Sequence, residues 1–253
     1  MSAIRVIPSL LIHKGGLIKS VQFKDYKYVG DPINAVKIFN EKEVDEIAVI
    51  DIDATRENST PNIAAIAAIA SEAFMPMAYG GGITTIAQIK EILYNGIEKV
   101  IINKAAHTNP KLICEAAGLF GNQSVVVSID VKKVFLKGYR VFTDNGKKNT
   151  GLHPVAFAQQ VAALGAGEIL LNSIDKDGTF TGYDLALIEQ VSSAVSIPVI
   201  ALGGATTVND FKLAKQAGAS ALAAGSMFVF QMPHKAVLIS YPARKELKEI
   251  IVK

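Results

Sequence analysis

Acidic residues stand at or just after the ends of several short apolar runs in this 253-residue sequence. Asp51 and Asp53 close one run, Asp130 closes another, and Asp175 and Asp177 follow a third. A carboxyl group can give or take a proton during a reaction, so each of these residues could act as a general acid or base. Helix capping or turn formation explains Asp53 and Asp177 equally well, but neither explains Asp130, which is our candidate catalytic residue.

Glycine clusters follow other apolar runs, at 80–82, at 203–204 and at 225, where Ser226 comes next. Glycine lets a ligand approach the backbone closely, and N–H groups at the start of a following helix bind phosphate. Two groups of such turns, half a chain apart, predict a ligand with two phosphates on opposite sides of one site. The alternative at each position is a turn that needs glycine only for its own backbone.

Eight short apolar runs, most of them unbroken, alternate with stretches of helical spacing. An unbroken run is typical of a parallel strand covered on both faces. The predicted strands are Arg5–Leu11, Glu46–Asp51, Met75–Tyr79, Lys99–Asn103, Ser124–Asp130, Glu168–Asn172, Pro198–Leu202 and Ala219–Ala224. The predicted helices include Asn62–Ala73, Ile86–Asn95, Ala156–Leu164 and Phe211–Ala217. Eight such units in a chain of this length favour a closed (βα)8 barrel, with an open doubly wound sheet as the alternative.

The two halves of the sequence resemble each other. "YGGGITT" at 79–85 matches "LGGATT" at 202–207, and "DIDAT" at 51–55 matches "SIDKDGT" at 173–179, with an offset of about 120 residues. We therefore expect residues 1–253 to form a single α/β domain, a (βα)8 TIM barrel with an internal half-barrel duplication. The polar segment 134–151, after the fifth strand, is expected to form a hairpin or a long loop.

The same alignment of the halves shows a difference at one position. "IPSLLIHK" at 7–14 overlays "VVSIDVKK" at 126–133, which sets Leu11 against Asp130. A barrel with two catalytic carboxylates across its mouth would need Asp or Glu at position 11. Because leucine can neither donate nor accept a proton, only half of such a pair is present.

Four charged residues begin apolar runs, namely Arg5, Glu46, Lys99 and Glu168. The starts of parallel strands meet at one end of a barrel, opposite to its active-site end. If the four side chains point inward, they form a neutral ring that closes this end, because buried charges must be paired. If they point outward, they are ordinary solvated residues.

Composition narrows the class of protein. The formal net charge is +3, and the lysines and arginines are spread along the chain, which suits a small anionic ligand better than nucleic acid. The single cysteine, Cys114, can form neither an internal disulfide nor a thiolate cluster, and the histidines lack metal-ligand spacing. No signal peptide, membrane-length apolar run or dinucleotide fingerprint is present, so we expect a cytoplasmic protein with no membrane partner and no cofactor.

Four segments carry a resemblance to a known family: "GDP" at 30–32, "YGGGI" at 79–83, "GKKNTG" at 146–151 and "AGEILLNSIDKDGT" at 166–179. With them, essentially the whole chain resembles the HisF family, the cyclase subunit of imidazole glycerol phosphate synthase. The related HisA-type isomerases also combine a duplicated barrel with two phosphate sites. "GKKNTG" and the four charged residues favour HisF.

The resemblance implies a substrate with two phosphates and assigns residues to each site. One phosphate site is matched by Gly82 and Asn103. The other is matched by Asp177, Gly178, Gly204, Gly225 and Ser226. Lys19 matches a lysine on the mobile loop after the first strand, which covers the substrate in the family.

The resemblance also implies a partner. Arg5, Glu46, Lys99 and Glu168 match a charged gate, through which ammonia from a HisH-like glutaminase subunit enters the barrel. Phe120 and Gln123 match positions near the face where that subunit docks. In the family, ammonia then attacks the substrate and two aspartates assist ring closure.

Three positions depart from the family pattern. Asp130 is retained, but Leu11 occupies the place of the other catalytic aspartate, Asn172 stands where threonine is usual, and Lys104 stands where a small polar residue is usual. The combination is similar to a side branch associated with surface-polysaccharide genes. In that branch, HisF-like and HisH-like subunits supply ammonia to an N-sugar amidotransferase.

Three functions therefore compete. The first is a subunit that channels ammonia to an N-sugar amidotransferase and has little cyclase activity of its own. The second is a working cyclase of histidine biosynthesis, in which another group replaces the missing acid. The third is a barrel that activates a glutaminase without catalysing a reaction.

Overall fold

The computed structural model describes residues 4–57 and 59–251. Within them, eight parallel strands form a closed barrel, in which β12 pairs with β1 and β7 pairs with β10. These strands are β1 (Arg5–His13), β4 (Ile47–Asp51), β5 (Met77–Gly80), β6 (Lys99–Ile102), β7 (Val125–Val134), β10 (Glu168–Ser173), β11 (Val199–Leu202) and β12 (Ala221–Ala224). Each of the eight predicted runs overlaps one of them, and β1, β5, β7 and β10 extend beyond the predicted ends. The (βα)8 barrel is confirmed, and the open doubly wound alternative is wrong.

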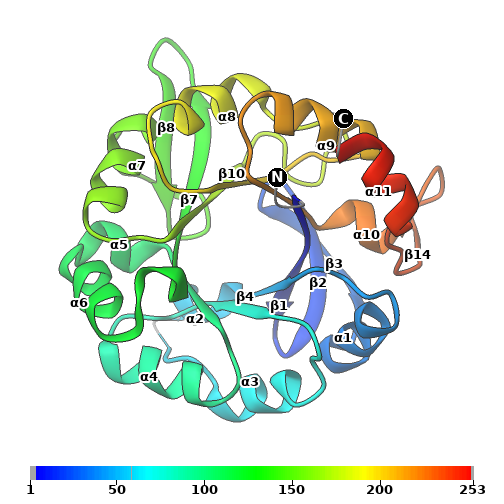
Figure 1. The fold of residues 1–253 in the computed structure, drawn as a ribbon, viewed down its shortest axis with the longest axis horizontal. Helices are drawn as coiled ribbons and strands as arrows, with labels where there is room; N and C mark the ends of the chain where they lie inside the picture. The colour runs from blue at the N-terminus through cyan, green and yellow to red at the C-terminus, as the bar shows by residue number, and fades with distance from the viewer. Residues whose placement is uncertain (1–3, 58, 252–253) are drawn as a thin grey trace.

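Helices surround the barrel as an outer ring (Figure 1). They are α1 (Pro32–Glu41), α2 (Ile52–Arg56), α3 (Ile63–Ala70), α4 (Ile86–Tyr94), α5 (Lys104–Thr108), α6 (Lys111–Phe120), α7 (Pro154–Ala163), α8 (Leu185–Ser192), α9 (Val208–Gln216), α10 (Ser226–Val229) and α11 (Arg244–Ile251), with a 3-10 turn η1 (Asn122–Ser124). The four predicted helices correspond to α3, α4, α7 and α9. In the part of the chain that the structure describes, no helix is both long and apolar enough to cross a membrane.

Side-chain caps explain where two of the predicted helices begin. The Asn62 side chain accepts a hydrogen bond from the backbone N–H of Ala65 at the start of α3. Thr85 and Gln88 form a reciprocal capping box at the start of α4. Such caps satisfy N–H groups that have no partner within the helix, and they fix the point at which each strand-to-helix turn ends.

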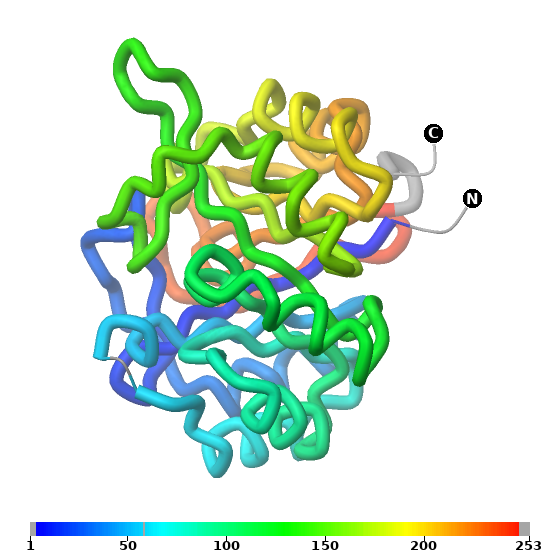
Figure 2. The backbone as a smooth tube through the Cα atoms, turned by 90° about the vertical axis from the view of Figure 1, so that its left-hand side faces the viewer, coloured from blue at the N-terminus to red at the C-terminus, as the bar shows by residue number. Residues whose placement is uncertain are grey.

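Two hairpins extend barrel strands at the end where those strands finish. After β1, the chain forms β2 (Gly16–Val21) and β3 (Lys24–Gly30), and after β7 it forms β8 (Gly138–Thr143) and β9 (Lys148–Asn149). The turn between β7 and β8 projects beyond the rest of the molecule (green, upper left in Figure 2). The second hairpin was predicted from the polar segment 134–151, whereas the first was expected to be a loop. A further small hairpin joins β13 (Phe230–Gln231) and β14 (Ala236–Val237).

Apolar side chains fill both the barrel and the space between barrel and helices. The larger core lies between strands and helices, and it includes Phe39, Phe157 and Phe211, each at most 2% exposed. A second buried cluster fills the barrel interior and comprises Ile7, Ala48, Ala78, Ile101, Val126, Leu170, Ile200, Leu202, Ala221 and Ala223. Successive residues of a strand point to opposite faces, so the residues two places before and after this layer also point inward. The layer therefore separates the charged residues at the strand starts from the polar residues at the strand ends.

Candidate functional site

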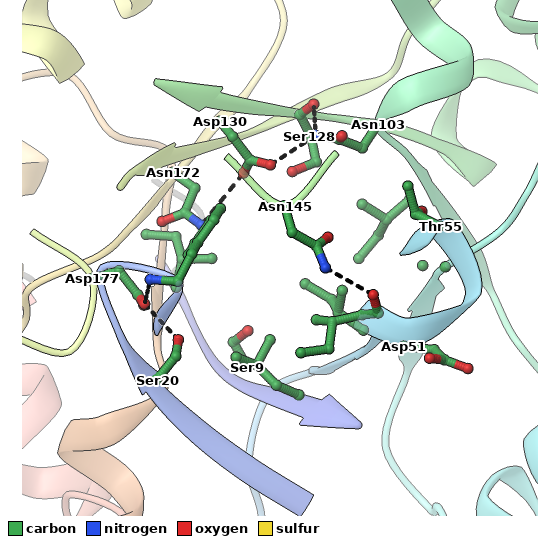
Figure 3. Close-up of a pocket in the computed structure, with 18 of the residues that line it drawn as sticks. Ser9, Ser20, Asp51, Thr55, Asn103, Ser128, Asp130, Asn145, Asn172 and Asp177 are labelled. Atoms are coloured by element: carbon green, nitrogen blue, oxygen red, sulfur yellow. Dashed lines mark hydrogen bonds between the residues drawn. The ribbon is translucent and has the colours of Figure 1, made fainter. Parts of the chain in front are cut away.

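A cavity of about 290 Å³ lies at the carboxyl ends of the barrel strands. Residues at or after the ends of all eight strands line it (Figure 3). The residues assigned to catalysis and ligand binding at this end of the barrel line the cavity, and they are Leu11, Lys19, Gly82, Asn103, Asp130, Asp177, Gly178, Gly204, Gly225 and Ser226. Asp53 and Asp175, which the sequence also offered as acids or bases, are not among the lining residues. The structure therefore brings the sequence-predicted mouth residues together around one space.

Asp130 stands near the end of the regular barrel part of β7, and its side chain is 9% exposed. Asn103 donates a hydrogen bond of 3.0 Å to Asp130 Oδ2 and another of 3.0 Å to the backbone oxygen of Ser128. Burial raises the pKa of Asp130 to about 7, and the negative charge of Asp177 adds to the effect, while the amide hydrogen bonds oppose it. A carboxyl group that titrates near neutral pH is suited to general acid–base work.

The contacts of Asn103 refine the sequence-based expectation. Its side-chain amide is directed at Asp130 and Ser128, so it positions the acid. A phosphate contact from this residue would therefore have to come from its backbone N–H. Asn103 thus connects the acid to the phosphate site that the sequence predicts beside Gly82.

Asn172 is paired with Asp130 through neighbouring positions of β10 and β7. Its Nδ2 atom lies 3.4 Å from Asp130 Oδ1, while its Oδ1 atom is buried without a hydrogen-bond partner in the structure. The same oxygen lies close to Gly203, where an added Cβ would be 3.0 Å away. A buried amide oxygen without a partner is destabilising.

Leu11 is on the side of the mouth opposite to Asp130. In the closed ring of strands, β1 and β7 are four places apart in either direction. Leu11 pairs with Ile50 of β4, as Asp130 pairs with Asn172 of β10. One side of the cavity thus presents two apolar side chains where the other presents a carboxyl group and an amide.

Backbone geometry requires glycine at both predicted phosphate sites. Gly82 has a φ of +66°, and a Cβ there would lie 2.7 Å from the backbone oxygen of Ser59. Gly204 has a φ of +101°, and a Cβ there would lie 2.3 Å from the backbone oxygen of Gly182. These are conformations and distances that a side chain does not tolerate. Tight packing therefore suffices to explain these two glycines, and phosphate binding stays a prediction.

Lys19 lies in strand β2, which corrects the expectation of a loop residue. Its side chain is buried, and its Nζ atom donates to the backbone oxygen of Ser9. A Cβ at Gly225 would lie 2.8 Å from Nζ, so the ammonium group reaches the predicted second phosphate site. Burial lowers the pKa of Lys19 to about 8, although the charge of Asp177 opposes the shift.

Asp177 fastens the β2–β3 hairpin over the cavity. Its Oδ2 atom accepts a hydrogen bond of 2.8 Å from Ser20 Oγ and one of 3.4 Å from the N–H of Phe23, and its backbone oxygen accepts one of 2.9 Å from the N–H of Gln22. Burial raises the pKa of Asp177, while the bonds from Ser20 and Phe23 and the charge of Lys19 oppose the shift. The predicted second phosphate site is therefore covered by a hairpin that this aspartate holds.

The four charged residues at the strand starts form a ring at the other end of the barrel. Arg5 bonds to Glu46 and, at 2.7 Å, to Glu168. Lys99 Nζ lies 2.9 Å from Glu46 and 3.2 Å from Glu168. The side chains are between 4% and 29% exposed, so all four are largely withdrawn from water. The inward orientation, one of the two alternatives left open by the sequence and the one that the resemblance implies, is present, and each charge contacts both residues of opposite sign.

Phe120 and Gln123 lie near this charged end. Phe120 ends α6, and Gln123 lies in η1, directly before β7 begins. Gln123 is exposed and Phe120 is half-buried. Both residues are accessible at the end where the sequence predicts a partner to dock.

Several residues that line the cavity were not singled out from the sequence. Ser9 and Ser128 each lie two residues before Leu11 and Asp130, so the inward alternation of a strand would have indicated them. Asn145 reaches the cavity from the turn between β8 and β9, where its Nδ2 atom donates to the backbone oxygen of Ile52 at 2.9 Å. No local pattern indicates a contact between segments so far apart in the chain.

Among residues 4–57 and 59–251, no group of three or more His, Cys, Asp or Glu side chains could hold a metal ion. The polar groups around the cavity are instead amides, hydroxyls, two lysines and carboxyl groups, which suit proton transfer and anion binding.

Known proteins resemble this chain over nearly its whole length. Residues 5–233 match the family model of histidine biosynthesis proteins. A Pseudomonas aeruginosa protein that carries the provisional name imidazole glycerol phosphate synthase subunit hisF2 is 53% identical, over 94% of this chain and 95% of its own length. A Leptospira interrogans protein, provisionally named imidazole glycerol phosphate synthase subunit HisF, is 48% identical over 96% of each chain.

A third relative carries the HisF name without qualification. It is the imidazole glycerol phosphate synthase subunit HisF of a Hydrogenobaculum species, 45% identical over 98% of this chain and 97% of its own length. The family match and these identities, together with the barrel and the cavity at its mouth, agree with one another. The chain therefore belongs to the HisF family of imidazole glycerol phosphate synthase subunits.

Proposed function

We propose that residues 1–253 act as one cytoplasmic domain that receives ammonia from a HisH-like glutaminase and passes it through the barrel to an N-sugar amidotransferase of surface-polysaccharide synthesis. One observation carries the proposal. The charged ring at the barrel's entrance is complete, whereas Leu11 lines the mouth at the position where the resemblance implies a second catalytic carboxyl group. The chain thus retains the means to admit ammonia and lacks half of the acid–base pair for cyclisation.

Exposed apolar residues near the charged ring support a partner at that end. Phe74 is 89% exposed, Tyr94 80% and Leu119 65%. Each lies at the end of a helix or just after one, before the next barrel strand begins, so all three are at the end where strands start. Large exposed apolar side chains gathered at one end of a molecule indicate a protein interface. HisF subunits work with a HisH glutaminase, and this face fits such a partner.

The apolar side of the mouth is a reason to expect that the chain has only weak cyclase activity. Leu11 and Ile50 lie side by side in the barrel and both line the cavity. A positioned acid or base contributes roughly 10²–10⁴-fold to a rate, and this side of the cavity offers no such group from β1. Asp130 would have to serve both as acid and as base from one side of the ligand.

The second candidate is a working cyclase of histidine biosynthesis, and the pKa of Asp130 favours it. A carboxyl group with a pKa of about 7 both gives and takes a proton near neutral pH. The two glycine-rich turns that the sequence assigns to phosphate also line the same cavity. A glutaminase activator without chemistry of its own is the third candidate, and the polar, pKa-shifted groups of the mouth speak against it.

One experiment separates the three. The purified chain is mixed with a HisH-like glutaminase at micromolar concentration, and complex formation, glutamine hydrolysis and cyclase turnover with added ammonium salt are measured. The proposal expects a heterodimer, faster glutamine hydrolysis and very slow cyclisation, with nitrogen transfer only when the amidotransferase is present. Cyclase turnover of about 1 s⁻¹ or more, an ordinary enzyme rate, would establish the second candidate instead. Failure to associate would overturn the proposal.

A further inference from the structure

The turn between β8 and β9 crosses the mouth of the barrel. Asn145, labelled in Figure 3, donates its 2.9 Å hydrogen bond to the backbone oxygen of Ile52, which directly follows β4. Gly146 packs on the ring of Phe23 from the β2–β3 hairpin, since a Cβ there would be 3.0 Å from Phe23 Cδ2. We call residues 144–146 the crossing turn. It covers the cavity together with the β2–β3 hairpin.

A single ion pair ties the crossing turn to the predicted first phosphate site. Asp144 Oδ1 lies 2.7 Å from Lys104 Nζ. Lys104 directly follows Asn103 and lines the cavity together with Gly82, Thr84 and other residues. The cation that departs from the family pattern is therefore held at this site by a carboxylate from the turn.

The crossing turn has a backbone that depends on its contacts. Asp144, Asn145 and Gly146 have φ values of +53°, +54° and +73°. Consecutive residues in this left-handed region are unfavourable outside glycine, although Asp and Asn tolerate it best. Such a conformation persists where surrounding contacts hold it.

We propose that Lys104 is a ligand for the phosphate group of a bound phosphate monoester, and that the phosphate takes Lys104 from Asp144 and so releases the crossing turn. The inference rests on the phosphate site of the proposed function and adds to it a residue and a coupled movement. Ligand binding at one side of the cavity would then loosen the cover over it.

Charge explains the direction of the exchange. The side chain of Lys104 is 37% exposed and that of Asp144 is 29% exposed, so their attraction is screened by water and weak. A phosphate monoester carries about −1.5 to −2 charges near neutral pH and three acceptor oxygens, against a single charge on Asp144. Lys104 therefore gains by turning to the phosphate, and the phosphate then repels the Asp144 carboxylate.

The test measures phosphate affinity in a double-mutant cycle. Inorganic phosphate and ribose 5-phosphate are titrated into the isotope-labelled chain, and amide shifts at Gly82 and Gly225 report the two predicted sites separately. The variants are Lys104→Met, which keeps most of the stem, Asp144→Asn, which keeps the shape and suits the left-handed backbone, and their combination. Lys148→Met is the matched control, because Lys148 is an exposed lysine in the neighbouring strand β9.

At the Gly82 site, Lys104→Met should weaken binding about 10-fold, the loss expected for one charge-assisted contact. Asp144→Asn should tighten binding by about 3-fold, since it frees Lys104 from a weak pair. The combined variant should match Lys104→Met, and Lys148→Met should match the wild type. Phosphate should also speed amide exchange at residues 144–147 in the wild type but not in Lys104→Met.

The outcomes distinguish this inference from the function on which it rests. Equal affinities in the wild type, Lys104→Met and Asp144→Asn would overturn the exchange and leave the phosphate site intact. If phosphate shifts the Gly82 amide signal neither in the wild type nor in any variant, both the exchange and the first phosphate site are wrong. Because Asp144→Asn leaves the cavity wall unchanged, its result decides the matter even if Lys104→Met folds poorly.

Discussion

The two ends of the barrel both bury charged groups, but the charges are paired at one end and have shifted pKa values at the other. At the entrance, Arg5 and Lys99 each contact both Glu46 and Glu168, so every charge is compensated. At the mouth, burial moves the pKa of Asp130 and of Lys19 toward neutral pH. The entrance is thus built to keep its charges, as the proposed ammonia gate would require. The mouth is built from groups that change charge easily, as proton transfer and ligand binding require.

The largest effect that would test this contrast is the pH dependence of stability due to Asp130. Its pKa is about 7 in the folded chain and near 3.8 when unfolded, so the folded state binds more protons between these values. The free energy of unfolding contributed by this residue must therefore fall as pH rises through that window, by about 3 kcal/mol between pH 5 and pH 8. Urea unfolding of Asp130→Asn should show a stability curve that lacks this fall.

Lys19 supplies a control with the opposite sign. Its pKa is lowered to about 8 from 10.5, so the unfolded chain binds more protons between these values and stability rises with pH there. Lys19→Met should remove a rise above pH 8 and leave the fall below pH 8 unchanged. Parallel curves for the wild type and Asp130→Asn below pH 8 would show that the mouth does not shift Asp130 as described.

The next prediction asks whether the mouth lacks only one group. Leu11→Asp returns a carboxylate to the side of the cavity that faces Asp130, and it should raise cyclase turnover with ammonium salt by about 10²-fold. Leu11→Asn is the matched control, because it has nearly the same shape but no acid. A wild-type chain that already turns over at about 1 s⁻¹ would contradict the prediction and show that another group replaces the missing acid.

The sequence predicted those features that follow from period and strand order. Unbroken apolar runs identified all eight barrel strands, and the ends of those runs placed Asp130 and Leu11 at the mouth. The pattern alone left open whether the four charged residues point inward, and the family resemblance implied that they do; in the structure Arg5 shares the inward face with Ile7. Apolar runs and alternation are patterns over a few neighbouring residues. Once the strands are known to form a barrel, these patterns tell which end and which face of the barrel each residue occupies.

Contacts between distant segments could not be predicted in this way. The sequence gives no indication that Lys19 lies in a strand and bonds back to Ser9, because a short polar hairpin has no distinctive period. Likewise, only the folded chain shows that the side chain of Asn103 holds Asp130 or that Asn145 spans the mouth. Each depends on how far a loop reaches across the barrel.

Replacing Lys99 in the charged ring should have a smaller effect. Removing one partner of an isolated buried ion pair costs about 3–5 kcal/mol, because the other charge is left unpaired. Because Arg5 contacts both Glu46 and Glu168, neither is left bare, and we expect Lys99→Leu to lower the free energy of unfolding by only about 2 kcal/mol. Glutamine hydrolysis in the complex should also become less well coupled to nitrogen transfer.

The control for the gate is Lys42→Leu, an exposed lysine just after α1 at the same end of the barrel. It removes one positive charge without touching the ring, and it should leave both stability and coupling unchanged. If Lys99→Leu behaves like Lys42→Leu, the ring contributes neither to stability nor to coupling, and the entrance does not select ammonia.

The smallest effect concerns the unpartnered oxygen of Asn172, on the polar side of the mouth. Asn172→Thr removes this buried oxygen, while a threonine hydroxyl can still donate to Asp130, so stability should rise by about 1 kcal/mol. In a chain of this size that corresponds to roughly 2–4 °C in Tm. Asn172→Val, which removes the oxygen and the donor together, separates the two contributions and should not stabilise as much, because Asp130 then loses a hydrogen bond. If Asn172→Thr lowers Tm instead, the amide contributes to the folded state through contacts that the hydroxyl cannot replace. If Asn172→Thr raises Tm but weakens binding of a phosphosugar, the amide oxygen serves the ligand. The mouth would then be less stable than it could be in return for tighter binding, whereas the entrance, with every charge paired, shows no such loss of stability.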